Sequence, residues 1–325
     1  MDKLINLLYA AVLAGTPLLF GTLGEILTEK SGNLNLGVEG MMFMGGVAGL
    51  AGAFYYEKFV TAPSGALAVL IAVICAFFSG AFGALIYSFL TVTMRANQNV
   101  TGLALTIFGA GFGNFFGEVM ANTTASGYAG VGNKIKDAFL GISIPGLSSI
   151  PFFGKLLFNY NILVYLGVII AAAMAYLLNK TRAGLNLRAV GENPATADAA
   201  GINVTLFKYI ATCVGGGICG IGGMYVVMVT CSGIWVHNCI NGMGWIAVAL
   251  VIFATWNPSR ALLGSLVFGG LSILRLYLPL GIPMQIYGTL PYAATVVVLV
   301  ATSIRQSREH RIPQSCGYNY FREER

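Results

Sequence analysis

The sequence predicts an all-α polytopic membrane protein with about nine transmembrane helices (eight to ten), an external N-terminus and a cytoplasmic C-terminus. Of its 325 residues, 57% are hydrophobic and 9% are charged, whereas an ordinary soluble domain carries about 25% charged residues. The 43 glycines suit helices that pack closely in lipid. Basic residues gather at the ends of apolar runs. This composition excludes a soluble domain, and it gives no reason to expect nucleic-acid binding.

A membrane span needs roughly 20 apolar residues. The first apolar run exceeds the usual signal-peptide core of about 7–15 residues, so we expect it to remain as a span. The uncharged stretch 209–259 is too long for one span, and turn residues at 232–241 divide it. The segment after this break is short, so either a full span or a re-entrant segment fits it. The expected spans are Leu4–Gly24, Leu34–Tyr55, Ala66–Thr91, Val100–Gly117, Ile162–Asn179, Tyr209–Thr230, Gly242–Trp256, Ser259–Leu278 and Ile286–Ile304.

Positive charge predicts which loops stay in the cytoplasm. If the polar stretch 180–208 is cytoplasmic, alternation of the spans puts ten basic residues inside and five outside. The ten are Lys30, Arg95, Lys180, Arg182, Arg188, Lys208, Arg260, Arg305, Arg308 and Arg311, and the five are Lys3, Lys58, Lys134, Lys136 and Lys155. We therefore expect one transmembrane domain over 1–304, with an external loop at 118–161, a cytoplasmic loop at 180–208 and a basic cytoplasmic tail at 305–325.

The stretch "EKSGNLNLGVEGMMFMGG", residues 29–46, places polar groups at the start of the second span. Asn33 or Asn35 can cap this helix, and the carboxylate of Glu39 is favoured near a helix N-terminus. That is a purely structural role. A role at a cytoplasmic gate is the alternative, because a polar helix start is tolerated where it lines a water-filled cavity.

The loop 180–208 contains the signals of a short helix. Asn193 is a good N-cap and Pro194 suits the first helical position. An alanine-rich run follows, and Gly201 suits the C-terminal cap, where a positive φ is needed. We expect the small alanine face, including Ala197, to offer a docking surface, although an ordinary connector has the same pattern.

Nucleotide-binding and catalytic motifs are missing from the sequence. The Gly154-Lys155 pair is followed by Leu156, so no Walker A pattern is present. "GGGICG", Gly215–Gly220, fits G-x-G-x-x-G by letter, but it lies inside an apolar run without a preceding strand. We interpret it, with the rest of the run Gly215–Gly223, as a surface for close helix packing.

Four stretches together resemble one family. "LRAVGENPATADAAGI" is similar to the cytoplasmic coupling segment of ABC-importer permeases, in the branch that serves branched-chain amino acids, simple sugars and nucleosides. "SGNLNLGVEGMMFMGG", "IPGLSSIPFFGKLLFNYNILVYL" and "MGWIAVALVIFATWNPSRALLGSLVFGG" resemble further markers of the same branch. The resemblance runs nearly end to end, and within the branch it is closest to permeases of nucleoside-type uptake systems.

The resemblance implies a multi-pass pore subunit in a bacterial cell membrane, and not an enzyme. A second permease chain completes the pore, with a heterodimer favoured over a homodimer. Separate ATPase subunits carry ATP and Mg²⁺, so this chain itself binds no cofactor and no metal. An extracytoplasmic lipoprotein delivers the substrate. The residues that would couple to the ATPase are Gly191, Glu192, Asn193, Pro194, Ala197, Asp198 and Gly201, with Glu192 and Asp198 meeting basic residues at the rim of the ATPase groove.

The substrate expectation is nucleosides, with simple sugars or branched-chain amino acids as alternatives. A nucleobase stacks on aromatic rings and bonds to amides, so Phe112, Asn114, Tyr225 and Trp245 are candidates beside the possible gate residues Asn33, Asn35 and Glu39. Packing of the aromatic residues is the simpler alternative.

A secondary transporter is the rival class of protein. It usually places carboxylates for a coupling ion deep in its spans. The acidic residues Glu25, Glu39 and Glu118 fall near span ends instead.

Overall fold

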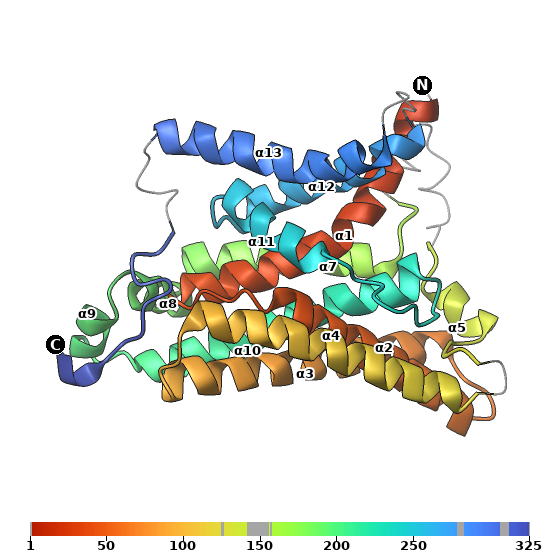
Figure 1. Ribbon diagram of the computed structural model, residues 1–325, viewed down its shortest axis with the longest axis horizontal. Coiled ribbons are helices and arrows are strands. Elements are labelled where there is room, and N and C mark those ends of the chain that lie inside the picture. Colours follow the sequence, from red (N-terminus) through yellow and green to blue (C-terminus); the bar gives the residue numbers. More distant parts are fainter. Residues whose placement is uncertain are drawn as a thin grey trace.

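The computed structural model shows a bundle of helices (Figure 1). The structure describes residues 2–124, 127–141, 156, 158–277, 283–305 and 312–324. Pro145, Pro151 and other parts of the expected external loop, together with residues 306–311 of the tail, lie outside the described residues. The principal helices are α1 (Asp2–Lys30), α2 (Val38–Phe59), α3 (Gly65–Ser88), α4 (Gln98–Asn122), α5 (Asn133–Ala138), α7 (Ile162–Lys180), α8 (Arg182–Glu192), α9 (Pro194–Ala199), α10 (Val204–Tyr225), α11 (Met243–Phe253), α12 (Pro258–Tyr277) and α13 (Met284–Arg305).

Within the described part of the chain, six helices are long and apolar enough to cross a membrane. They include α3 and α10 with the π-helical turns that extend them, Phe89–Thr93 and Val226–Thr230. Apolar helices of 10–17 residues occur at Met243–Phe253, Pro258–Leu274 and Ile286–Val298. The expectation of an all-helical, multi-pass protein is confirmed, whereas nine crossings and the orientation stay predictions.

Local sequence sets where many of these helices begin. Five residues act as N-caps through a side-chain oxygen that accepts the N–H of the residue three positions later, which satisfies an otherwise unpaired donor. They are Asn97 for α4, Asn161 for α7, Thr181 for α8, Asn193 for α9 and Asn203 for α10.

Helix α10 is the centre of the bundle. In its most apolar window 83% of the residues are buried, against 33% for α3, α4 and α7. Its glycines touch three neighbours, because a Cβ on Gly215 would overlap α1, one on Gly223 would overlap α2, and one on Gly220 would overlap α3. The prediction that the run Gly215–Gly223 is a close packing surface is confirmed.

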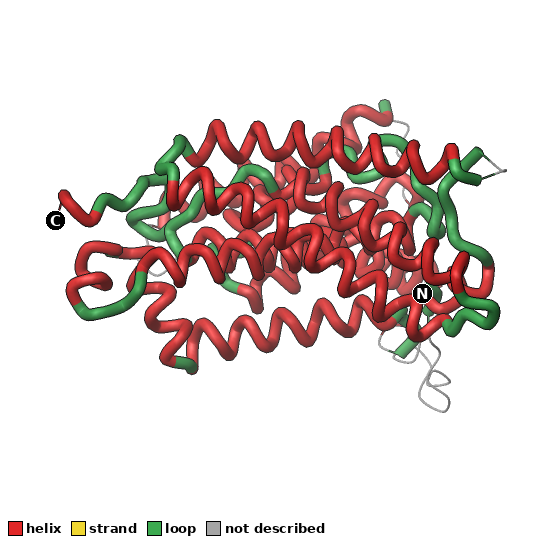
Figure 2. The backbone as a smooth tube through the Cα atoms, turned by 90° about the horizontal axis from the view of Figure 1, so that it is seen from below, coloured by secondary structure: helices red, strands yellow, loops and turns green. Residues whose placement is uncertain are grey.

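The bundle has two ends along its long axis (Figures 1 and 2). Helices α8 and α9 and the C-terminus lie at one end, which we call the α9 end, and α5 and the N-terminus lie at the other, the α5 end. In Figure 1, α12 and α13 lie above α11, and α2, α3, α4 and α10 lie below it, while α1 runs obliquely from the N-terminus at the upper right down into the bundle.

Residues 31–37 enter the bundle from the α9 end. They follow the end of α1 at Lys30, yet Val38, the first residue of α2, packs beside Gly21. Gly21 lies nine residues before the end of α1, which is about 13 Å along a helix. Helix α2 therefore starts inside the bundle and not at its surface.

Residues 231–242 enter from the α5 end without forming a helix. Ile234 forms an isolated bridge with Gly130, close to α5, and Trp235 packs on Gly117 of α4. Helix α11 then starts inside the bundle and has 11 residues, about 16 Å of helix in a bilayer core of about 30 Å. It ends near Trp256, whose indole bonds to Glu29 at the α9 end of α1. The short expected segment Gly242–Trp256 is thus the helical part of a longer stretch of chain, 231–256, which runs through the bundle from the α5 end toward the α9 end.

Candidate functional site

The two non-helical segments, 31–37 and 231–242, meet at Glu39, and we call them the irregular segments. This residue lies in the first turn of α2, is 9% exposed, and accepts a hydrogen bond from the N–H of Gly242 at 2.8 Å. Gly242 precedes α11, whose start has no other side-chain cap, and Gly244 packs directly on Glu39. Since the first N–H groups of a helix lack partners inside it, a carboxylate in the first turn of α2 supports the start of α11.

The two asparagines in segment 31–37 have different hydrogen-bond partners. The Asn35 side chain accepts the N–H of Gly37 at 2.9 Å, and its own backbone N–H donates to Glu25 at 3.1 Å. Asn35 thus shapes the turn that leads into α2, although the N-cap itself is Gly37. Asn33 does not cap α2, because its amide donates to Thr212 of α10 at 2.9 Å and accepts from Lys208 at 3.2 Å.

Segment 231–242 is tied to α4 by polar contacts. The Asn114 amide donates to the Asn238 side chain at 2.8 Å and accepts the Asn238 backbone N–H at 3.1 Å. Asn238 has a positive φ of 55°, a conformation that asparagine tolerates better than most residues. Next to this pair, His237 lies 3.1 Å from Glu118.

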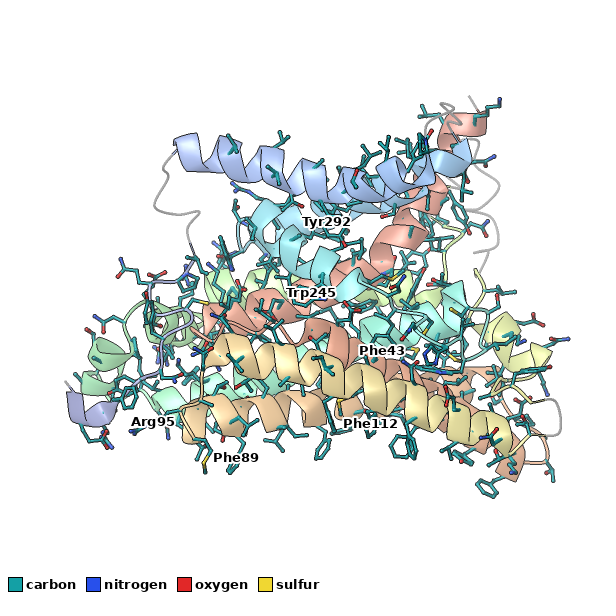
Figure 3. The ribbon with its side chains drawn as sticks, in the orientation of Figure 1. Phe43, Phe89, Arg95, Phe112, Trp245 and Tyr292 are labelled. Carbon is teal, nitrogen blue, oxygen red and sulfur yellow. The ribbon has the colours of Figure 1, made fainter. Side chains whose placement is uncertain are left out.

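The aromatic candidates divide into two groups. Tyr225 is 0% exposed and its hydroxyl accepts from Asn161 at 3.4 Å, so it packs the bundle interior and no base can stack on it. Trp245 is 37% exposed, and in the view of Figure 3 it lies between Tyr292 and Phe43. Phe112 is partly exposed and its ring makes tilted contacts with the rings of Phe108 and Phe116 on α4. Trp245 and Phe112 therefore keep free ring surface, whereas Tyr225 does not.

The short helix expected in the loop 180–208 is present as α9. Asn193 caps it, Pro194 takes its first position, and Gly201 has a φ of 82°. Ala197 faces the other way from our expectation. It is 3% exposed and packs in a small cluster with Val190 and Val204. A six-residue helix is too short for its pattern to show which side is buried.

Two acidic residues that we expected to meet a partner already bond within the chain. The Glu192 side chain accepts the backbone N–H of Gln314 at 3.4 Å. Asp198 accepts from the Tyr320 hydroxyl at 2.8 Å and forms an ion pair with Arg322 at 3.2 Å. Gly191 also contacts the tail, since its carbonyl accepts the N–H of Ser315 at 3.0 Å.

Sequence reasoning missed Asn238, Gly242 and the returning tail. The string "HNCINGMG", residues 237–244, did contain a signal, because Asn-Gly pairs favour left-handed turns. Asn241 and Gly242 both adopt positive φ, 32° and 85°. The contacts of the tail join residues more than 100 positions apart, and no local pattern predicts such pairings.

Comparison with known proteins gives consistent matches. The family described as "Branched-chain amino acid transport system / permease component" matches residues 6–300. The guanosine ABC transporter permease protein NupQ of Bacillus subtilis is 34% identical over 304 residues, 90% of this chain and 89% of that protein. The nucleoside ABC transporter permease protein NupC of Lactococcus lactis is 30% identical over 94% of each chain. The "Putative glucose ABC transporter permease protein TsgC13" of Haloferax volcanii is 33% identical over 99% of each chain.

These matches cover both irregular segments, α9 and all the helices that surround Glu39. The chain therefore belongs to the ABC transporter permease family described as the permease component of branched-chain amino acid transport systems.

Proposed function

We propose that this chain is the permease subunit of an ABC importer for nucleosides. The observation that carries the proposal is its likeness, over nine-tenths of its length, to a guanosine permease and a nucleoside permease. The site supports it chemically, because a nucleoside offers a flat base for stacking and polar edges for amides. Trp245 and Phe112 supply partly exposed rings, and the Asn114–Asn238 pair supplies amides.

The meeting point at Glu39 is the proposed gate. Non-helical backbone at membrane depth is tolerated where it is buried in protein or lines a water-filled cavity. Transporters commonly place their substrate where interrupted helices meet. Segments 31–37 and 231–242 are two such interruptions, entering from opposite ends and joined by the Glu39–Gly242 bond.

We further propose nine crossings, with the N-terminus outside and the α9 end in the cytoplasm of a bacterium. Separate ATPase subunits dock at α9 and hydrolyse ATP. A second permease chain, different from this one, completes the pore, and a lipoprotein delivers substrate at the α5 end. Reporter fusions after Arg188 and after Lys136 test the orientation. The first is expected to report cytoplasm and the second the exterior, and the same side for both would contradict the topology.

Uptake measurements test the substrate. Deletion of the gene is expected to lower uptake of labelled guanosine, adenosine or uridine, and wild-type chain supplied in trans is expected to restore it. A strain that retains nucleoside uptake but loses leucine uptake would instead make the chain an amino acid permease.

Glucose is the second candidate substrate. It is favoured by the similarity to TsgC13, which extends over 99% of both chains. The same deletion strain separates the two, because loss of glucose uptake with unchanged nucleoside uptake selects this alternative. Trp245→Ala sharpens the distinction, since loss of a stacking ring is worth about 0.5–1.5 kcal/mol beyond buried area and is expected to raise the half-saturation concentration for nucleosides.

The coupling role of α9 has its own test. Gly201 has positive φ and open space where a Cβ would stand, so Gly201→Ala and Gly201→Val differ mainly in how poorly they adopt this backbone. We expect Gly201→Val to lower ATPase co-purification and uptake, with Gly201→Ala between it and wild type. Normal co-purification and uptake of Gly201→Val would make the segment a simple connector.

A further inference from the structure

The C-terminal segment 312–324 returns to the bundle and contacts the coupling segment. Ser315 donates to the carbonyl of Gly191 through its backbone N–H at 3.0 Å and its hydroxyl at 2.6 Å. Tyr320 and Arg322 hold Asp198, whose side chain is 15% exposed. The Tyr320 ring also packs on the cluster that buries Ala197. One side of this segment is therefore attached to α8 and α9.

Its other side is attached to the turn between α3 and α4. The Asn319 amide donates to the carbonyls of Arg95 at 2.6 Å and Ala96 at 3.1 Å. The Gln98 amide donates to the Tyr318 carbonyl at 3.3 Å and to the Asn319 side chain at 3.2 Å. The Arg95 guanidinium lies 4.6 Å from the centre of the Phe321 ring. Helix α9 itself packs mainly on α8 and α10. Through these contacts the tail connects α9 to the turn between α3 and α4.

The same turn leads to the proposed gate. The Gln98 side chain accepts the N–H of Leu34 at 2.7 Å while its amide bonds to the tail. Leu34 belongs to segment 31–37, which ends at α2 and Glu39. A chain of direct contacts thus runs from α9 through residues 312–324 and Gln98 to the start of α2.

Space beside the segment leaves it room to move. A cavity of about 480 Å³ is lined by the tail residues Asn319, Tyr320, Arg322 and Glu323, by Asp198 and Arg95, and by Lys208 in the first turns of α10. The part of the segment from Asn319 to Glu323 therefore borders open space, whereas Pro313 is buried and Ser315 packs beside Gly32.

We propose that residues 312–324 form a strap that transmits the movement of α9 to the α3–α4 turn and to segment 31–37. The proposal rests on the proposed function, because it takes the ATPase to push on α9. It adds an element that lies beyond the family match, which ends at residue 300. Rigid contacts of this kind transmit force because packed elements shift as units.

Matched variants test the strap in proteoliposomes that contain the full chain, its partner permease, the ATPase subunits and the binding protein. Tyr320→Ala together with Asn319→Ala removes side-chain contacts on both edges, namely the bond to Asp198 and the bonds to Arg95, Ala96 and Gln98. Tyr318→Ala with Gln314→Ala is the control, since Tyr318 is 72% exposed and both residues join the strap network only through backbone atoms. The strap variant is expected to keep its ATPase and hydrolyse ATP, but to import about tenfold less substrate per ATP, within the usual range of allosteric coupling. The control is expected to match wild type.

Alkylation of Cys316 reports on the strap independently of transport. Burial, followed by the charges of Glu29 and Glu25, raises the pKa of the Cys316 thiol. Because the thiolate is the nucleophile, Cys316 is expected to react slowly with N-ethylmaleimide at pH 7 in wild type, as measured by mass spectrometry of its peptide. The strap variant is expected to react several-fold faster, and the control at the wild-type rate.

Three outcomes would overturn the proposal. The first is fast alkylation of Cys316 in the strap variant with normal import per ATP. The second is loss of the ATPase from that variant, which would make the segment part of the docking surface. The third applies if the double variant does not fold. Tyr320→Phe with Arg322→Gln then removes the hydroxyl bond and the ion pair between the tail and Asp198, and normal import per ATP by this variant contradicts the strap. Failure of the wild-type complex to hold any ATPase would instead refute the proposed function.

Discussion

Helices α10 and α11 are held in the bundle by different means. Helix α10 approaches three neighbours so closely that its glycines leave no space for a side chain. Helix α11 begins inside the bundle, and its start is supported by a hydrogen bond to Glu39, with the preceding segment tied to α4 through Asn114. Close packing resists small shifts, because a densely packed interior does not deform continuously. Hydrogen bonds at a helix start can exchange partners. We infer that α10 is the fixed frame and that the start of α11 is the movable part.

Breaking the frame is expected to have the largest effect. Gly220→Leu would force a side chain into the backbone of α3 at Ala76, and overpacking costs about 1–3 kcal/mol, occasionally more, with backbone overlap at the upper end. Little folded protein is expected in detergent by size-exclusion chromatography. Gly111→Leu is the matched control, because nothing lies within 4 Å of a Cβ at that position. Equal yields for the two variants would contradict the difference in packing.

Removing the support of α11 is expected to impair transport more than folding. Glu39→Ala deletes the acceptor for Gly242, and a hydrogen bond to a charged group is worth about 1.5–3 kcal/mol. Glu39→Gln retains an acceptor oxygen and is expected to transport at a rate between Glu39→Ala and wild type. Uptake rates at equal surface expression measure this. If Glu39→Ala aggregates as Gly220→Leu does, the start of α11 belongs to the frame.

The smallest expected effect concerns the attachment to α4. Asn114→Ala removes the reciprocal bonds to Asn238, about 1 kcal/mol, which corresponds to roughly a fivefold change in local opening. Hydrogen exchange of the amides in 237–242 is expected to accelerate by that factor. Asn122→Ala, an exposed asparagine on the same helix, is expected to leave the exchange unchanged. Unaltered exchange in Asn114→Ala would show that other contacts hold the segment.

Sequence reasoning succeeded where a local property decides the structure. The apolar runs predicted the helices, the run Gly215–Gly223 predicted close packing, and Asn193 with Pro194 predicted the start of α9. It failed where the structure depends on contacts between residues far apart in the sequence. Nothing near Glu39 indicates that its acceptor serves Gly242, and nothing near Asp198 indicates that Tyr320 returns to it. The burial of Ala197 also depends on Val190, Val204 and the tail, which no period in a six-residue helix reveals.

The position of Glu39 has a consequence for ion leakage. A helix N-terminus carries about half a positive charge, and here the starts of α2 and α11 meet at one carboxylate within the bundle. The two partial charges approximately balance that carboxylate, so the point offers no net attraction for a cation. A cation that leaves water at this point would receive no net compensation for its lost hydration, whereas a neutral solute loses far less, so a passage that opened at Glu39 would favour a neutral solute over Na⁺.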